Sequence, residues 1–161
     1  MRILVVHGSK RGGTSGLAEM IGAALGELGH EVTVAPARSV PDLPHTDAVV
    51  VAGGIYAGTW HGDTVWFVKH HARALRELPT WLVGSGPLDD SAARGTFTLG
   101  ASVLNLATRI GARGTQAFGG YLAADASGFL AAAMAKTKAG DWRDPEHVRR
   151  WTKEVDAALA A

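Results

Sequence analysis

Residues 5–21 constrain the fold of this chain more than any other segment. They read as an apolar strand, then a turn rich in glycine and hydroxyl side chains, then an amphipathic helix. The start of a helix leaves backbone N–H groups unpaired and carries partial positive charge, and glycines let an anion approach those groups closely. The sequence therefore predicts a phosphate-binding turn. Its candidate ligand-binding residues are Ser9, Lys10, Arg11, Gly12, Gly13, Thr14 and Ser15.

Two other glycine-rich nucleotide loops do not fit this spacing. A P-loop has a lysine directly after its last glycine, whereas Thr14 follows Gly13 here. The dinucleotide fingerprint Gly-x-Gly-x-x-Gly is not met by the glycines at positions 8, 12, 13 and 16. Lys10 and Arg11 either add positive charge beside the anion or remain solvated loop cations, and the sequence leaves both interpretations open.

The turn and its flanks resemble the flavodoxin signature, in which an aliphatic pair, an aromatic residue, a Ser or Thr, a small residue, a Thr and an Ala recur at set spacings. The matching residues are Val5, Val6, Ser9, Gly12, Thr14, Ala18 and Ile21. His7 stands where the family usually has an aromatic residue. The resemblance implies a flavodoxin-like fold that binds FMN through its single phosphate.

Strand and helix patterns alternate along the chain, which predicts an α/β fold with a doubly wound parallel sheet in three layers. Five strands are expected at residues 3–7, 31–35, 48–53, 80–83 and 115–122, and helical stripes at 17–28, 65–75, 99–110 and 148–159. Asp144 is the expected N-cap of the last helix and Pro145 its first residue. With no internal repeat or linker, residues 1–161 form one predicted domain. By analogy with the family, the strand order is 2-1-3-4-5.

The same analogy places the ligand above the carboxyl ends of strands one, three and four, so the loops after strands three and four complete the site. The first loop supplies Gly54, Ile55, Tyr56, Ala57, Gly58, Thr59 and Trp60, and the second supplies Ser85, Gly86, Pro87 and Leu88. Tyr56 and Trp60 are the candidates for stacking on a flat ring, with ordinary packing as the alternative. The second loop is either a ring contact or a plain turn before a helix.

Composition excludes several classes of function. The chain has no cysteine, so disulfides, thiol catalysis and cysteine-ligated clusters are excluded. A formal charge of +1 argues against nucleic-acid binding, and the histidine spacing does not indicate a metal site. No apolar run is long enough to span a membrane and no signal peptide is visible, so a cytoplasmic location is expected.

More of the chain resembles one branch of the flavodoxin-like group, the menaquinone-dependent protoporphyrinogen dehydrogenases. The matching segments are 9–14, 49–61, 66–71, 118–122 and 141–142. This resemblance implies a quinone and a porphyrinogen as candidate partners. The chain departs from the branch at Tyr56 and Ala57, where a basic residue and a tyrosine are usual. The insertion at 123–141 is also shorter, and it is predicted to form a short helix covering the sheet edge rather than a membrane anchor.

Three functions follow from these features. The first is an FMN-dependent oxidoreductase of the dehydrogenase type, which passes electrons from an organic substrate to a quinone or another acceptor. The second is a flavodoxin-type electron carrier with a redox partner and no small-molecule substrate. Carriers dock through an acidic surface, whereas this chain has 16 Lys and Arg against 15 Asp and Glu, which favours the enzyme. The third is a binding module that has lost the flavin, and the intact hydroxyls of the turn argue against it.

Overall fold

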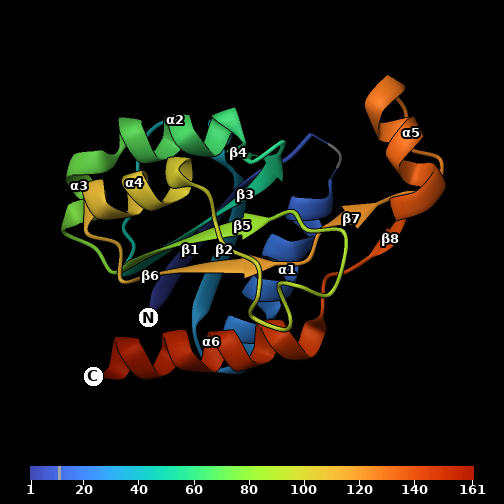
Figure 1. The fold of residues 1–161 in the computed structure, drawn as a ribbon. Coiled ribbons are helices and arrows are strands. Elements are labelled where there is room, and N and C mark those ends of the chain that lie inside the picture. The colour runs from blue at the N-terminus through green and yellow to red at the C-terminus, as the bar shows by residue number, and fades with distance from the viewer. Residues whose placement is uncertain (11) are drawn as a thin grey trace.

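The computed structural model describes residues 1–10 and 12–161 as a parallel sheet between two layers of helices (Figure 1). Its parallel strands are β1 (Arg2–Gly8), β2 (Glu31–Pro36), β3 (Ala48–Tyr56), β5 (Thr80–Ser85) and β6 (Gly114–Phe118). They are hydrogen-bonded in the order β2-β1-β3-β5-β6. Because β4 (Thr59–Trp60) is a short strand that pairs only with β3, this order is the expected 2-1-3-4-5 arrangement, which is confirmed.

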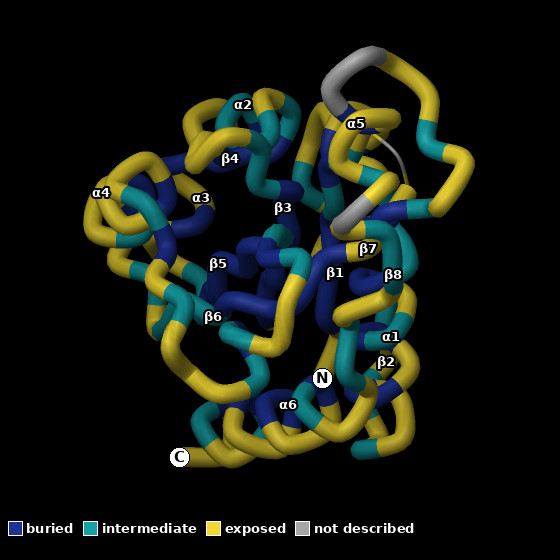
Figure 2. The backbone as a smooth tube through the Cα atoms, turned by 45° about the vertical axis from the view of Figure 1, so that its right-hand side comes forward, coloured by how far each residue is buried: buried dark blue, intermediate teal, exposed yellow. Residues whose placement is uncertain are grey.

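The helices cover the two faces of the sheet. On one face lie α1 (Gly13–Glu27) and α6 (Pro145–Ala160), and on the other lie α2 (Gly62–His70), α3 (Ala72–Arg76) and α4 (Ala101–Ile110). A 3-10 turn, η1 (Ala37–Ser39), follows β2. The central strands are buried on both faces, as the dark tube of Figure 2 shows, and this explains the continuous apolar run of β3.

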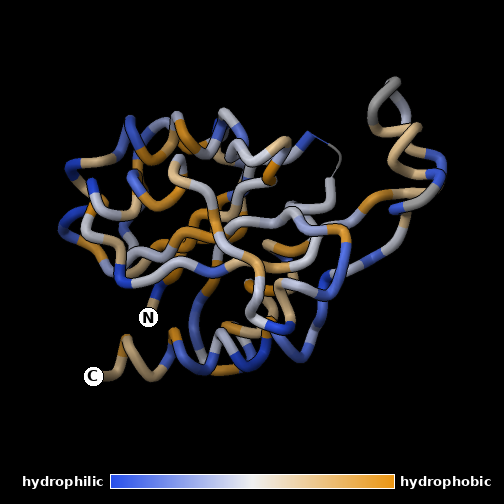
Figure 3. Tube along the Cα trace, viewed as in Figure 1, coloured by the Kyte–Doolittle hydropathy of each residue, from blue (hydrophilic) through white to orange (hydrophobic). Residues whose placement is uncertain are grey.

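Side chains of successive strand residues enter two separate cores. Val49 and Val51 pack on the side of α2 to α4, and Val50 and Ala52 pack on the side of α1 and α6. Each outer helix buries one face against the sheet. In α6 this amphipathic pattern is visible as alternating hydrophobic and hydrophilic segments along the tube (Figure 3). The buried face of α6 consists of Val148, Trp151, Thr152, Val155 and Leu159.

The last helix begins as expected. The Asp144 carboxylate accepts a hydrogen bond from the N–H of Glu146 at 2.9 Å, and Pro145 is the first helical residue. Such a cap satisfies one of the N–H groups that the first turn leaves unpaired.

Two predicted elements are divided in the structure. The helix expected over 65–75 ends at His70 and resumes at Ala72. His71 is buried and its Nε2 lies 3.0 Å from the carbonyl oxygen of Val40. The division therefore falls at a residue whose side chain makes a buried polar contact.

The strand predicted over 115–122 is wrong beyond Phe118. A Cβ on Gly119 would lie 1.9 Å from the carbonyl oxygen of Trp142, so the chain turns there in close contact with another backbone segment. After the turn, β7 (Tyr121–Leu122) pairs antiparallel with β8 (Gly140–Asp141) instead of continuing the parallel sheet.

The segment between β7 and β8 forms α5 (Phe129–Lys138). The prediction of a short helix is confirmed, but its expected place over the sheet edge is wrong. In Figure 1 α5 stands beyond the carboxyl ends of the strands, away from the two helical layers. Among the residues that the structure describes, no helix has the length and hydropathy to cross a membrane.

Candidate functional site

A cavity of about 420 Å³ opens at the carboxyl ends of the parallel strands. The three expected loops contribute Ser9, Lys10, Gly13 and Thr14; Ile55, Tyr56 and Ala57; and Ser85, Gly86 and Leu88. The volume falls within the range of about 300–1,000 Å³ that is typical of small-molecule sites. The topology thus brings together three segments that are far apart in the sequence.

The turn between β1 and α1 is held by two serine hydroxyl groups. The N–H of Gly12 donates to Ser9 Oγ at 3.0 Å, and Ser15 Oγ donates to the carbonyl oxygen of Gly12 at 2.7 Å. Gly12 has a φ of +78°, a conformation that glycine adopts without strain. Ser15 therefore uses its hydroxyl proton inside the turn and does not line the cavity, although it was expected to contact an anion.

The first turn of α1 faces the cavity with backbone donors that have no acceptor in the part of the chain that the structure describes. Thr14 lines the cavity and is 3% exposed. Among the described residues, the backbone N–H groups at positions 13–15 have no hydrogen-bond acceptor. Such donors are suited to an anion. Arg11, which was also expected here, lies outside the described residues.

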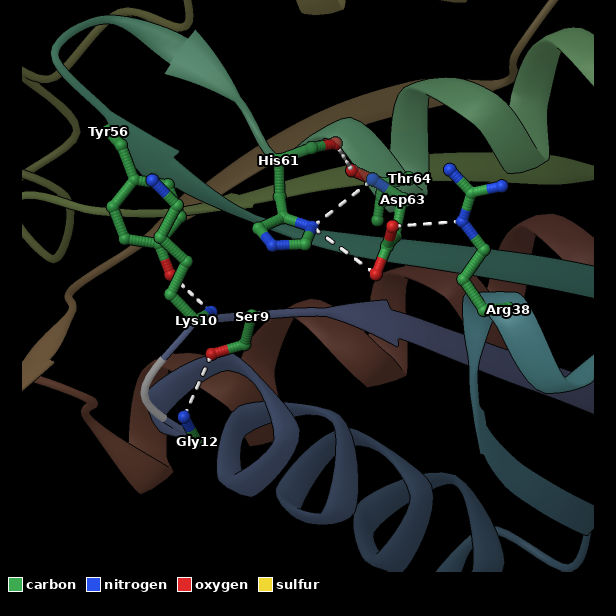
Figure 4. A network of polar contacts seen from close by, with 8 residues as sticks. All are labelled: Ser9, Lys10, Gly12, Arg38, Tyr56, His61, Asp63 and Thr64. Carbon is green, nitrogen blue, oxygen red and sulfur yellow. Dashed lines mark hydrogen bonds and ion pairs between the residues drawn. The ribbon is translucent and has the colours of Figure 1, made fainter.

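Tyr56 lies against this turn from the opposite side (Figure 4). Its hydroxyl accepts a hydrogen bond from the backbone N–H of Lys10 at 2.8 Å, and Lys10 Nζ lies 5.0 Å from the centre of the Tyr56 ring. A Cβ on Gly54 would come within 2.8 Å of the Tyr56 hydroxyl, so the ring needs a glycine beneath it. Tyr56 is thereby an aromatic wall beside the predicted phosphate turn.

Trp60 does not line the cavity, which corrects the expectation that its ring stacks on a ligand. Its side chain is 1% exposed, and its Nε1 donates to the carbonyl oxygen of Val83 at 3.1 Å. The reason is that β3 continues beyond the predicted end and forms a tight hairpin with β4, in which Trp60 pairs with Ile55 and faces the core. Ala57 and Gly58 form the turn, with φ values of +49° and +77°.

Other expected residues support the site without lining it. Gly58 and Thr59 are exposed in the hairpin, Gly54 accepts the N–H of His61 through its carbonyl, and the carbonyl of Pro87 accepts the N–H of Gly120. Their contributions are backbone geometry and hydrogen bonds.

One wall of the cavity was not predicted. It consists of Gly120, Tyr121, Leu122, Ala131 and Met134, from the turn after β6, β7 and α5. A strand was predicted across this region, although the glycine pair at 119–120 signals a break in a strand. These residues place apolar surface opposite the loops after β3 and β5.

Among the described residues, the lining of the cavity contains Lys10 and no acidic side chain. Asp89, which follows the lining residue Leu88, is exposed, and hydrogen bonds from the hydroxyl and the N–H of Ser91 lower the pKa of its carboxyl group. Among the described residues, no group of histidine or acidic side chains could hold a metal ion. The site therefore combines a turn whose donors suit an anion with largely apolar walls.

A doubly wound sheet with a cavity at its carboxyl edge, beside the first turn of a helix, is typical of α/β proteins that bind nucleotides. A profile of the flavodoxin domain family matches residues 4–139. The chain therefore belongs to the flavodoxin domain family, and membership implies flavin binding.

Individual known proteins are similar to parts or all of the chain. Protoporphyrinogen IX dehydrogenase (quinone) of Escherichia coli strain K12 is 30% identical over 82 residues, which are 50% of this chain and 45% of that protein. The chain thus spans about half the length of the curated relatives it matches.

Solved flavodoxins share the fold at low sequence identity. A mutant of flavodoxin from Pseudomonas aeruginosa has a TM-score of 0.65 at 20% identity and covers 100% of both chains. Oxidised flavodoxin 1 from Bacillus cereus has a TM-score of 0.60 at 14% identity, with 98% of each chain covered.

Proposed function

We propose that this chain binds FMN in the cavity, with the phosphate in the turn at residues 9–15. The observation that carries this proposal is the division of the cavity into two chemically different ends. One end offers Ser9, Thr14 and the first-turn N–H groups of α1, which have no acceptor among the described residues and suit a phosphate. The other offers Ile55, Leu88 and Leu122, which suit a flat, largely apolar ring.

The lining residues have distinct roles in this proposal. Thr14 and Ser9 hydrogen-bond the phosphate, Tyr56 supplies an aromatic face, and the backbone at Ser85 and Gly86 contacts the other edge of the ring. Bound FMN supplies electron transfer in one-electron or two-electron steps, while the protein orients the ring and sets its electrostatic surroundings.

The FMN proposal is tested with the purified apoprotein. We expect an oxidised flavin absorption spectrum after reconstitution, with quenched fluorescence, and markedly tighter binding of FMN than of riboflavin, because riboflavin lacks the phosphate. Equal affinity for the two flavins would contradict the assigned role of the turn. The same titration tests the third function, a module that has lost the flavin, since such a module binds neither.

We further propose that the loaded protein is an oxidoreductase of the dehydrogenase type. An organic substrate of the porphyrinogen kind loses two electrons and two protons, and a quinone or another acceptor takes up two of each. Two observations support this proposal. The matched half of the chain is similar to a quinone-dependent dehydrogenase, and the described lining of the cavity carries no carboxylate to oppose a negatively charged, fully reduced flavin.

The second candidate function is an electron carrier, which the likeness to solved flavodoxins favours. Stepwise anaerobic reduction distinguishes the two. For the dehydrogenase we expect the oxidised spectrum to convert directly into the fully reduced one, with one set of isosbestic points. A third spectrum that dominates at half reduction would favour the carrier.

Turnover provides the complementary test. The FMN-loaded protein is incubated anaerobically with protoporphyrinogen IX and a water-soluble quinone. We expect the porphyrinogen to be oxidised only when both FMN and the quinone are present. Oxidation at the rate of the protein-free control would refute the proposed substrate class.

A further inference from the structure

Arg143 lies between β8 and α6, outside the lining of the cavity. Its side chain contacts one residue in each of three elements, β8, α1 and β7. Its Nε and Nη2 donate to the two carboxylate oxygens of Asp141, each at 2.8 Å. Its Nη1 donates to the carbonyl oxygen of Gly13 at 3.2 Å, and the centre of the guanidinium lies 4.7 Å from the centre of the Tyr121 ring. The side chain is 17% exposed, so most of its surface is covered by the protein.

Two of the contacted residues line the cavity from different sides. Gly13 is the first residue of α1, at the predicted phosphate end, and Tyr121 belongs to β7, on the wall that the sequence did not predict. Asp141 pairs with Tyr121 across the β7–β8 ladder. Arg143 therefore joins the phosphate turn to this wall.

Two glycines of α1 leave the space that the contact needs. A Cβ on Gly13 would lie 3.2 Å from the Cβ of Tyr121, and a Cβ on Gly16 would lie 2.2 Å from Nη1 of Arg143. Both glycines are on the helix face that meets the β7–β8 hairpin. The helix surface is thus shaped to receive the tyrosine and the guanidinium.

The charge of Arg143 is already shared with a carboxylate. The guanidinium holds the pKa of Asp141 below its ordinary value, and the carboxylate raises the pKa of Arg143. A two-pronged pair of this kind fixes the orientation of the guanidinium as well as neutralising it. This arrangement suits a residue that positions other groups more than one that supplies free positive charge.

We propose that Arg143, held by Asp141, is a positioning residue for the flavin site, which fixes Tyr121 and the first turn of α1 relative to each other. The proposal rests on the proposed FMN site. Arg143 acts through Gly13 and Tyr121, and the width of the phosphate end of the cavity depends on it.

Flavin affinity is the first test. Arg143→Gln removes the bidentate pair and the bond to Gly13, and we expect FMN to bind roughly tenfold more weakly, an effect of the size found for residues that influence a site without contacting its ligand. Arg149→Gln is the matched control, because Arg149 pairs with Glu146 on the exposed surface of α6, away from the cavity. Wild-type FMN affinity in Arg143→Gln would overturn the inference.

Two further variants separate positioning from charge. Asp141→Asn leaves the guanidinium without its carboxylate, so we expect FMN affinity to fall several-fold because the orientation is lost. If Arg143 acted only as a cation, Asp141→Asn would raise FMN affinity and Arg143→Lys would bind FMN as the wild type does. We expect Arg143→Lys not to restore binding, because an ammonium cannot make the bidentate pair.

Hydrogen exchange of the apoprotein tests the inference without any flavin. The N–H of Trp142 donates to the carbonyl of Gly120 at 2.9 Å, and the N–H of Gly120 donates to the carbonyl of Pro87 at 2.9 Å. We expect these amides to exchange faster in Arg143→Gln, with the amides of residues 148–158 unchanged. Unchanged exchange at 120 and 142 would overturn the positioning role. If these amides exchanged faster in Arg143→Gln but the wild type bound no FMN, the proposed function would be refuted and the positioning of Tyr121 and α1 would stand.

Discussion

Thr14 and Ser15 are adjacent hydroxyl residues with different tasks. Ser15 donates within the turn to Gly12, whereas Thr14 lines the cavity and its hydroxyl forms no hydrogen bond to another described residue. The same chemical group therefore stabilises the turn at one position and is available to a ligand at the next. Residue type alone does not distinguish the two, because the helix geometry decides which side chain faces the cavity.

Thr14→Ala tests this division of tasks. We expect FMN to bind roughly ten- to a hundredfold more weakly, since a hydrogen bond to a charged phosphate contributes about 1.5–3 kcal/mol. Ser15→Ala should change FMN affinity much less. Isothermal titration of the two apoproteins measures both effects, and thermal denaturation without flavin verifies that Thr14→Ala remains folded. Equal losses of affinity would contradict the assignment.

Trp60 and Tyr56 also differ in task, although both are aromatic residues of the β3–β4 hairpin. Trp60→Phe removes the N–H that donates to Val83 and leaves space in the core. We expect the free energy of unfolding to fall by about 1–3 kcal/mol, with little change in the spectrum of bound FMN. Tyr56→Phe removes the acceptor of the Lys10 N–H and should instead change FMN affinity and spectrum. Urea denaturation and flavin titration of both variants measure these effects. If Trp60 contacted the ring, Trp60→Phe would change FMN affinity and the flavin spectrum.

At the scale of single elements, α1 carries glycines with different surroundings. Gly16 faces the guanidinium of Arg143, whereas Gly26 has nothing within 4 Å of the position of a Cβ. Glycine lowers helix stability relative to alanine by about 0.5–1 kcal/mol in a helix interior. A substitution is therefore expected to stabilise the helix at either site and to have a second effect only at Gly16.

Gly16→Ala should weaken FMN binding in the same way as Arg143→Gln, because the new methyl group displaces the end of the Arg143 side chain. Gly26→Ala should leave FMN affinity unchanged and raise the free energy of unfolding by up to about 1 kcal/mol. Denaturation curves and FMN titrations of the two variants check this. If Gly16→Ala bound FMN like the wild type, the contact between α1 and Arg143 would have no influence on the site.

For the molecule as a whole, two partly buried histidines link stability to pH. His7 is the penultimate residue of β1, and His147 lies in α6, where its ring contacts Phe118 and its Nε2 is 3.1 Å from the amide nitrogen of Gln116. Burial lowers the pKa of both histidines from the ordinary value of 6.5. Gln116 also donates to the carbonyl of Ala117, which orients its amide as a donor toward a neutral His147.

We therefore expect the protein to lose stability as pH falls below about 6.5. In that range the unfolded chain binds more protons than the folded one, so the free energy of unfolding decreases until pH reaches the lowered pKa values of the folded state. His147→Gln should reduce this slope between pH 6.5 and 5, whereas His45→Gln, at an exposed position, should not. Urea denaturation at several pH values measures the slopes, and identical slopes in the wild type and His147→Gln would contradict the role of His147.

Periodicity and turn chemistry were sufficient to predict the alternating strands and helices, because these depend on contacts that are local in the chain, such as the cap at Asp144 and the apolar run of β3. The sheet order and the three loops that meet at its carboxyl edge were implied by the resemblance to the flavodoxin family, combined with a general rule for parallel sheets. The buried positions of the His71 and Trp60 side chains were not predictable in this way, because each side chain contacts a partner distant in sequence, Val40 in one case and Val83 in the other.

The sequence by itself thus determined the alternation of strands and helices, the glycine-rich turn after β1 and most of the cavity lining, since hydrophobic pattern and glycine placement act over short distances along the chain. Only the tertiary structure decided where the insertion lies, which aromatic residue faces the cavity and what Arg143 contacts. Each of these depends on the close approach of backbones, such as Gly119 against Trp142 and Gly13 against Tyr121, and no local pattern records which distant segment occupies the space left by a glycine.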